Sequence, residues 1–134
     1  MPVAVIDFET TGSSPGQGAR ATEIAAVLVE DGRIVGHYQS LMQSGAWVPP
    51  FIEQLTGITH AMLADAPPAQ QVMREVLRFT AGCPLVAHNA AFDRGFWQAE
   101  ADLARHLEEL AARNVHVGAE LSFLGAGVPP SSAT

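Results

Sequence analysis

The chain has 134 residues, and 48% of them are hydrophobic, which fits one globular domain with a single core. One cysteine excludes an intramolecular disulfide framework, and no segment reaches the roughly 18 consecutive apolar residues that span a bilayer. Seven arginines against fourteen acidic residues give a formal charge of −7, which argues against nucleic-acid binding through clustered basic residues. We expect a cytoplasmic domain with no membrane contact. An enzyme whose metal ions bring positive charge to a phosphate is still allowed.

The first third of the chain predicts three strands. A β-branched apolar run over residues 2–8 is typical of a buried strand, and the polar, glycine-rich residues 13–18 predict a flexible loop after it. Residues 23–30 and 33–42 predict two further strands joined by Asp31-Gly32. Asp-Gly is a strong hairpin signal because both residues tolerate the positive φ of a tight turn. The three strands are therefore expected to be antiparallel neighbours.

The rest of the chain is predicted to be mainly helical. Residues 51–56 predict a short helix ended by Gly57, residues 69–81 have apolar residues at helical spacing, and residues 84–87 predict a short buried strand. Residues 90 to about 113 predict one long helix or two abutting ones, and both tryptophans, at 47 and 97, are interpreted as core residues. This order predicts an α/β domain over residues 1–113, a mixed sheet flanked by helices. Residues 114–134 are predicted to be a divergent, flexible tail, with a strand fragment at 115–117 and disorder over 125–134.

Two carboxylates stand at the end of the first predicted strand. Asp7 and Glu9 are two residues apart, so their side chains point to the same face while Phe8 points into the core. Two adjacent ionised carboxylates repel each other unless a cation lies between them, and hard divalent cations prefer oxygen ligands. The alternative is a polar strand end with both acids in water.

A third acid, Asp93, lies in the first turn of the last predicted helix, directly after the 84–87 strand. If that strand runs parallel to the first, its carboxyl end lies beside Asp7 and Glu9, where open α/β sheets form their sites. The alternative is a first-turn acid that is favoured there by the helix dipole alone.

Three segments carry a resemblance to a known family. Asp7-Phe8-Glu9-Thr10-Thr11-Gly12, Leu55-Thr56-Gly57-Ile58-Thr59 and His88-Asn89-Ala90-Ala91-Phe92-Asp93 resemble, in this order, motifs of the DnaQ-like 3′–5′ exonucleases. These enzymes form the His-containing branch of the DEDD superfamily and include proofreading epsilon subunits of bacterial DNA polymerase III. The resemblance covers about residues 3–100.

The resemblance implies a ribonuclease-H-like fold, with three antiparallel strands followed by a parallel one. It also implies a metal-dependent 3′–5′ exonuclease that acts on single-stranded or frayed 3′ ends of DNA, with polymerase subunits as partners. Two divalent cations, Mg²⁺ or Mn²⁺, would be held by the acids and would activate water for phosphodiester cleavage. By the same resemblance the metal-binding and catalytic residues are Asp7, Glu9 and Asp93, and the residues that contact the terminal nucleotide are Thr10, Thr11, Leu55, Thr56 and Phe92.

The chain departs from the family after the second motif. Active members carry a histidine followed five residues later by an aspartate, but neither His106 nor His116 is followed by an acid at that distance. His60 and Asp65 have the right spacing but precede the second motif, so we interpret that pair as coincidence. The C-terminal part of the fold is therefore predicted to be truncated or divergent. Two alternatives stay open: an inactive ribonuclease-H-like module that binds nucleic acid or a polymerase, and an RNA exonuclease.

Overall fold

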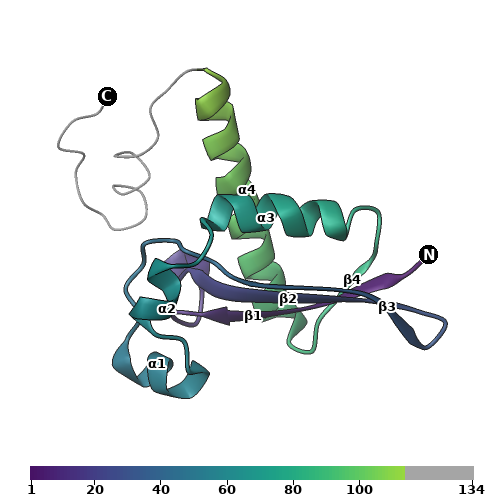
Figure 1. Ribbon diagram of the computed structural model, residues 1–134, viewed down its shortest axis with the longest axis horizontal. Helices are drawn as coiled ribbons and strands as arrows, with labels where there is room; N and C mark the ends of the chain where they lie inside the picture. The colour runs from purple at the N-terminus through teal and green to yellow at the C-terminus, as the bar shows by residue number, and fades with distance from the viewer. Residues whose placement is uncertain (114–134) are drawn as a thin grey trace.

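The computed structural model describes residues 1–113, which form a mixed four-stranded sheet with helices packed against it (Figure 1). The strand order is β3-β2-β1-β4; β1 is antiparallel to β2, β2 is antiparallel to β3, and β4 is parallel to β1. The strands are β1 (Val3–Thr10), β2 (Ala21–Glu30), β3 (Arg33–Leu41) and β4 (Leu85–Val86). This arrangement confirms the predicted mixed sheet of three antiparallel strands and one parallel strand.

The strand ends differ from the prediction. β1 continues to Thr10 and β2 begins at Ala21, because these two residues pair across a register shift that follows the Glu9–Glu23 pair. The third strand ends at 41 rather than 42. The fourth is two residues long rather than four, and its residues are exposed rather than buried. The hairpin is confirmed: Asp31 and Gly32 both have positive φ, 53° and 74°, as a tight turn of this kind requires.

The helices follow the sequence pattern with one omission. They are η1 (Pro15–Gln17), α1 (Pro50–Thr56), α2 (His60–Ala64), α3 (Ala69–Phe79) and α4 (Ala90–Ala112). The predicted 69–81 helix ends two residues early, the 90–113 segment is one continuous helix, and the loop at 13–18 contains the short turn η1. The sequence analysis missed α2. The Thr59 side chain caps the start of this helix by accepting a hydrogen bond from the Met62 N–H.

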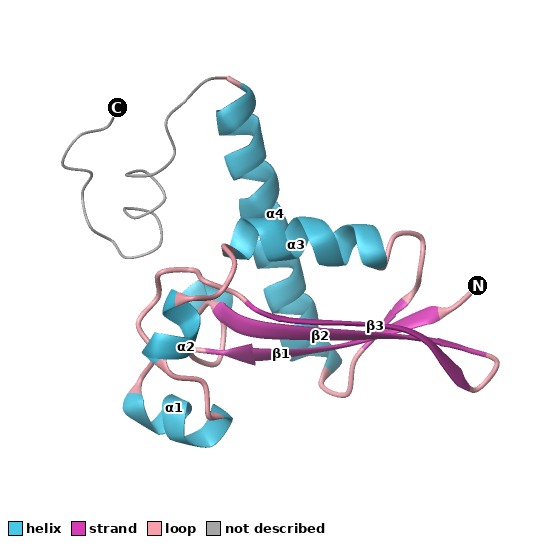
Figure 2. Ribbon diagram, in the orientation of Figure 1, coloured by secondary structure: helices cyan, strands magenta, loops and turns pink. Residues whose placement is uncertain are grey.

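The main core lies between the sheet and the two longest helices, α3 and α4 (Figure 2). Ile6 and Phe8 of β1 and Ile24 of β2 face these helices, and Phe8 packs against Phe96 with ring centroids 6.3 Å apart. A smaller apolar cluster, formed around Val48, Ile58 and Leu63, joins α1 and α2 at one end of the sheet. Trp97 packs against the main core as expected, but the core interpretation of Trp47 is wrong because 67% of its surface is exposed.

The predicted tail at 114–134, with its strand fragment and disordered end, lies outside the described residues. Within residues 1–113, no helix has both the length and the apolar character needed to cross a membrane.

Candidate active site

The first acid pair lies where β1 ends. Glu9 pairs with Glu23 and Asp7 pairs with Ala25 across the antiparallel ladder. Because Asp7 and Glu9 alternate with buried Phe8, both carboxylates lie on the face of the sheet opposite the main core. Asp7 is exposed and Glu9 is half-buried, so a cation could reach both from solvent.

The third acid reaches the same strand from the first turn of α4. Asp93 is only 2% exposed, and its Oδ1 accepts a hydrogen bond of 3.0 Å from the Phe8 N–H. Pairing between β1 and β4 covers only two residues of each strand, Ala4 and Val5 on β1. Beyond Val5, the Phe8 N–H of β1 bonds to the Asp93 carboxylate rather than to β4. Asp93 thus lies in the first turn of α4, beside the end of β1.

The acids affect one another electrostatically. Burial raises the pKa of Glu9, and the charges of Asp7, Glu23 and Asp93 raise it further. Burial also raises the pKa of Asp93; the Phe8 N–H lowers it in part, and Asp7 raises it. Negative charge is therefore disfavoured at this end of β1, and a bound cation would relieve that repulsion.

The donor set fits hard divalent cations, since all three groups are carboxylates under mutual repulsion. The residues that would hold the cations are Asp7, Glu9 and the free oxygen of Asp93. Among residues 1–113, no three acid, histidine or cysteine side chains are arranged so that they could hold a metal ion together. A cation bound by all three acids would require their side chains to move, and Asp7 is exposed.

Next to these acids is a cavity of about 450 Å³ between the end of β1, helix α1 and the start of α4. Glu9 lines it, so the cavity is continuous with one of the candidate metal ligands. Phe51 and Leu55 are 69% and 74% exposed, which leaves apolar surface available to a flat ligand. All five residues that the sequence assigned to the terminal nucleotide line this cavity, namely Thr10, Thr11, Leu55, Thr56 and Phe92.

Phe51 and Ile52 are among the lining residues that the sequence analysis did not assign to the site. Both belong to α1, and the Leu55 prediction already placed one side of that helix at the cavity. Residues three and four positions before Leu55 share its face, so helical spacing alone could have found them. Thr56 fixes the end of α1: its Oγ1 donates to the Ile52 carbonyl at 2.9 Å and accepts from the Ile58 N–H at 3.2 Å.

The threonine side of the cavity is held by a hydrogen-bonded turn. Thr10 Oγ1 donates to the Gly12 carbonyl at 2.7 Å. Thr11 is bound twice to Arg20: its N–H donates to the Arg20 carbonyl at 2.9 Å, and its Oγ1 accepts from the Arg20 N–H at 3.0 Å. Both threonines are buried, so their hydroxyls serve the fold as well as the cavity wall.

His60 has a structural role that agrees with the coincidence interpretation. Its Nε2 accepts a hydrogen bond of 3.0 Å from the Val48 N–H, and its Nδ1 lies 3.7 Å from a Glu53 carboxylate oxygen. These contacts join α2 to α1 and to the segment before α1, and Asp65 takes no part in them.

The structure thus combines a mixed four-stranded sheet, two carboxylates near the end of its strand β1, and a cavity of about 450 Å³ beside them. The profile of the exonuclease family RNase_T matches residues 4–123. The chain belongs to this exonuclease family.

Curated relatives resemble the chain over about 70% of its length. It is 44% identical over 92 residues to the 3′-5′ exonuclease DinG of Bacillus subtilis, covering 69% of this chain and 10% of DinG. It is 42% identical over 98 residues to a DNA polymerase III subunit epsilon-like protein of Rhodobacter capsulatus, covering 72% of this chain and 14% of that protein. The chain thus corresponds to a small part of each relative.

Solved structures support the fold. Exonuclease I of E. coli bound to a dA13 oligonucleotide matches 74% of this chain and 23% of its own, with a TM-score of 0.67 and 16% identity. A zinc-bound form of that enzyme with single-stranded DNA covers the same shares, with a TM-score of 0.66 and 18% identity. A 3′-exonuclease that recognises a histone mRNA stem-loop matches 78% of this chain and 41% of its own, with a TM-score of 0.64 and 23% identity.

Proposed function

We propose that residues 1–113 are a metal-dependent 3′–5′ exonuclease domain that removes nucleotides from the 3′ end of single-stranded or frayed DNA. The observation that carries the proposal is the cavity of about 450 Å³, which is lined by Glu9, by helix α1 and by the turn that carries Thr10 and Thr11, called the threonine turn below. The family membership and the relatives named as 3′-5′ exonuclease and epsilon-like protein support the same reaction. A polymerase assembly is the partner we propose.

In this proposal Asp7, Glu9 and Asp93 hold two divalent cations, Mg²⁺ or Mn²⁺. When bound, the cations supply a hydroxide nucleophile near neutral pH and stabilise charge on the phosphate oxygens. The reaction breaks the bond between the terminal phosphorus and the 3′ oxygen of the preceding nucleotide. It releases a nucleoside 5′-monophosphate and leaves a new 3′ hydroxyl.

The chain's own residues bind and orient the terminal nucleotide. Leu55 and Phe92 contact the base from two sides of the cavity, and such apolar contact is tolerant of sequence. Thr10, Thr11 and Thr56 form the part of the cavity wall that surrounds the sugar. Asp93 acts on the protein as well as on a cation, because its Oδ1 holds the Phe8 main chain and so fixes β1 against α4.

A single-stranded DNA oligonucleotide labelled at its 5′ end tests the proposal, with Mg²⁺ or Mn²⁺ present. The expected product is a ladder shortened one nucleotide at a time from the 3′ end. Asp7→Asn should reduce the rate by about 100-fold or more, as expected for loss of a metal ligand. Asp31→Asn, an exposed aspartate in the hairpin turn, should leave the rate unchanged. Equal rates in the wild type and Asp7→Asn would overturn the proposal.

A second candidate is an inactive module that binds nucleic acid or a polymerase. The observation that favours it is the absence of a histidine followed five residues later by an aspartate anywhere after Asp93. Loss of a positioned general base typically lowers a rate by 10²–10⁴-fold. Oligonucleotide binding without turnover, unaffected by Asp7→Asn, would select this candidate. An RNA oligonucleotide of the same sequence decides between DNA and RNA as substrate.

A further inference from the structure

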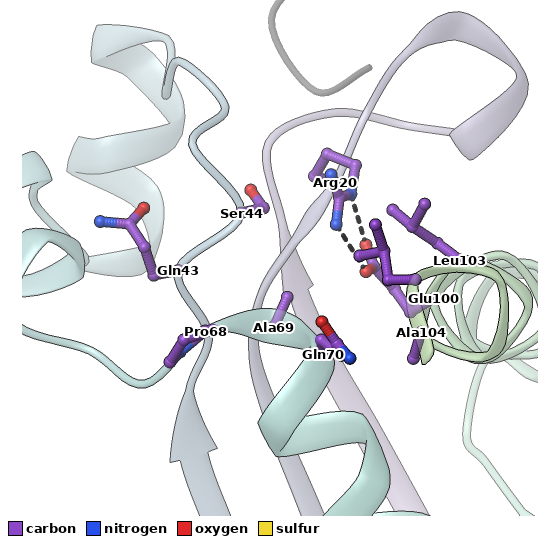
Figure 3. A pocket seen from close by; sticks show the side chains of 10 residues that line it. Arg20, Gln43, Ser44, Pro68, Ala69, Gln70, Glu100, Leu103 and Ala104 are labelled. Atoms are coloured by element: carbon purple, nitrogen blue, oxygen red, sulfur yellow. Dashed lines mark hydrogen bonds and ion pairs between the residues drawn. The ribbon is translucent and has the colours of Figure 1, made fainter. Parts of the chain in front are cut away.

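A buried ion pair joins Arg20, the residue before β2, to α4 (Figure 3). Glu100 of α4 binds Arg20 through two parallel hydrogen bonds, from Nε at 2.9 Å and from Nη2 at 3.0 Å. The Glu100 side chain is 3% exposed and that of Arg20 is 14% exposed. The pair lines two spaces, one of about 20 Å³ and one of about 390 Å³.

The pair is connected to the cavity through the main chain of Arg20. The Arg20 backbone makes two hydrogen bonds to Thr11, which lines the cavity. The same Glu100 carboxylate also accepts a 3.0 Å hydrogen bond from the Ala21 N–H, and Ala21 is the register partner of Thr10. Glu100 thus holds the strand segment that runs beside both threonines.

Glu100 is also related to Asp93 by helix geometry. The two residues are seven positions apart on α4, which is two helical turns, so they lie on one face of the helix, and both are buried. Each accepts a main-chain N–H from a different strand, Phe8 of β1 for Asp93 and Ala21 of β2 for Glu100. Helix α4 is therefore fixed to the sheet by two buried carboxylates, one on each side of the turn that carries the threonines.

We propose that Arg20 and Glu100 are positioning residues for the nucleotide cavity. They hold Thr11, and with it this part of the cavity wall, at a fixed position relative to Asp93 of α4. This inference rests on the proposed function. A bidentate arginine–carboxylate pair fixes orientation as well as distance, which a single contact does not. Buried ion pairs add little net stability compared with apolar residues, and a positional role accounts for keeping one here.

The test uses Glu100→Gln, with Glu109→Gln as the matched control. Glu109 is an exposed glutamate on the same helix, and Arg105 is its partner. Glu100→Gln removes the carboxylate charge and leaves Arg20 facing an amide, whereas Glu109→Gln makes the same chemical change where nothing is positioned. Binding of thymidine 5′-monophosphate is measured by calorimetry with Mg²⁺ present, and amide exchange is followed over residues 8–12.

For Glu100→Gln we expect a dissociation constant about tenfold higher and amide exchange over residues 8–12 at least tenfold faster, while Glu109→Gln matches the wild type. Arg20→Lys keeps the charge but loses the second hydrogen bond, so it should fold and should show the same defects. If Glu100→Gln does not fold, Arg20→Lys and the control Glu109→Gln still allow the measurement.

Two outcomes overturn the inference in distinguishable ways. If Glu100→Gln or Arg20→Lys lowers the melting temperature yet binds the nucleotide with wild-type affinity, the pair is only structural and the proposed function stands. If the wild type and Glu109→Gln also fail to bind the nucleotide, the proposed function fails and the inference fails with it.

Discussion

Adding Mg²⁺ to the metal-free protein should raise its melting temperature, because the cation relieves repulsion among three acids at the end of β1. Burial and neighbouring negative charges raise the pKa values of Glu9 and Asp93, so the folded protein carries these charges at a cost. A cation that binds only the folded state stabilises it by RT ln(1 + [L]/Kd). This linkage makes the candidate metal site measurable without any enzymatic activity.

The size of the effect follows from the number of residues that unfold together. At 10 mM Mg²⁺ and a Kd of about 1 mM the stabilisation is about 1.4 kcal/mol. For the 113 described residues and an unfolding entropy of about 2.1 cal/mol/K per residue, this corresponds to a rise of about 6 °C. Thermal unfolding followed by circular dichroism, in EDTA and then in Mg²⁺, resolves a change of that size.

Two variants separate metal binding from a general response to salt. Asp7→Asn removes a proposed ligand and so weakens Mg²⁺ binding. In this variant the rise in melting temperature should fall below about 2 °C. Glu23→Gln removes a carboxylate that also raises the pKa of Glu9 but is not a proposed ligand, so it should keep the full rise. If Asp7→Asn shows the same rise as the wild type, or the wild type shows none, the assignment of these acids to a metal site is refuted.

Three further predictions concern single side chains. Leu55→Ala should weaken thymidine 5′-monophosphate binding about tenfold in calorimetry while changing stability by less than about 0.5 kcal/mol, and Ile34→Ala, exposed to a similar extent, should change neither. Thr22→Val should raise the free energy of unfolding in urea by about 1 kcal/mol, because the buried Thr22 hydroxyl has no hydrogen-bond partner within residues 1–113. Burial and a hydrogen bond to Glu75 raise the pKa of Tyr38 to about 12, so the folded state keeps this proton longer than the unfolded state. Stability should therefore fall by about 1 kcal/mol, after allowance for solvent screening, as the pH rises from 10 to 12, and Tyr38→Phe should lack this step in alkaline denaturation.

Features set by short-range patterns were predictable from the sequence. The β-branched apolar run located β1, and the two residue types that tolerate positive φ located the hairpin at Asp31 and Gly32. The first-turn position of Asp93 followed from the end of the preceding strand. The cavity residues came from the family resemblance rather than from periodicity, and the structure brings all of them to one cavity.

Features that depend on contacts distant in sequence were not predictable. Arg20 and Glu100 are 80 positions apart, and a glutamate within a charged helix gives no sign that it is buried. Trp47 is of a residue type that often packs in a core, yet its side chain is exposed while its neighbour Val48 is buried in the smaller cluster. The extension of β1 to Thr10 depends on its pairing with Ala21 across a register shift, which no local pattern reveals.

The short parallel contact of β4 explains why α4 needs two buried carboxylates. Two paired residues, Leu85 and Val86, cannot by themselves fix the position of a helix of 23 residues that begins four residues later. Besides the apolar packing of α4 in the main core, Asp93 and Glu100 fix its position by accepting hydrogen bonds from the main chains of β1 and β2 at points two helical turns apart. A cation that draws the Asp93 carboxylate toward β1 therefore acts on the same rigid helix that holds the threonine turn. Metal binding and nucleotide binding should then be coupled, so that Mg²⁺ tightens thymidine 5′-monophosphate binding less in Glu100→Gln than in the wild type. Equal tightening in both proteins would show that the two sites act independently of α4.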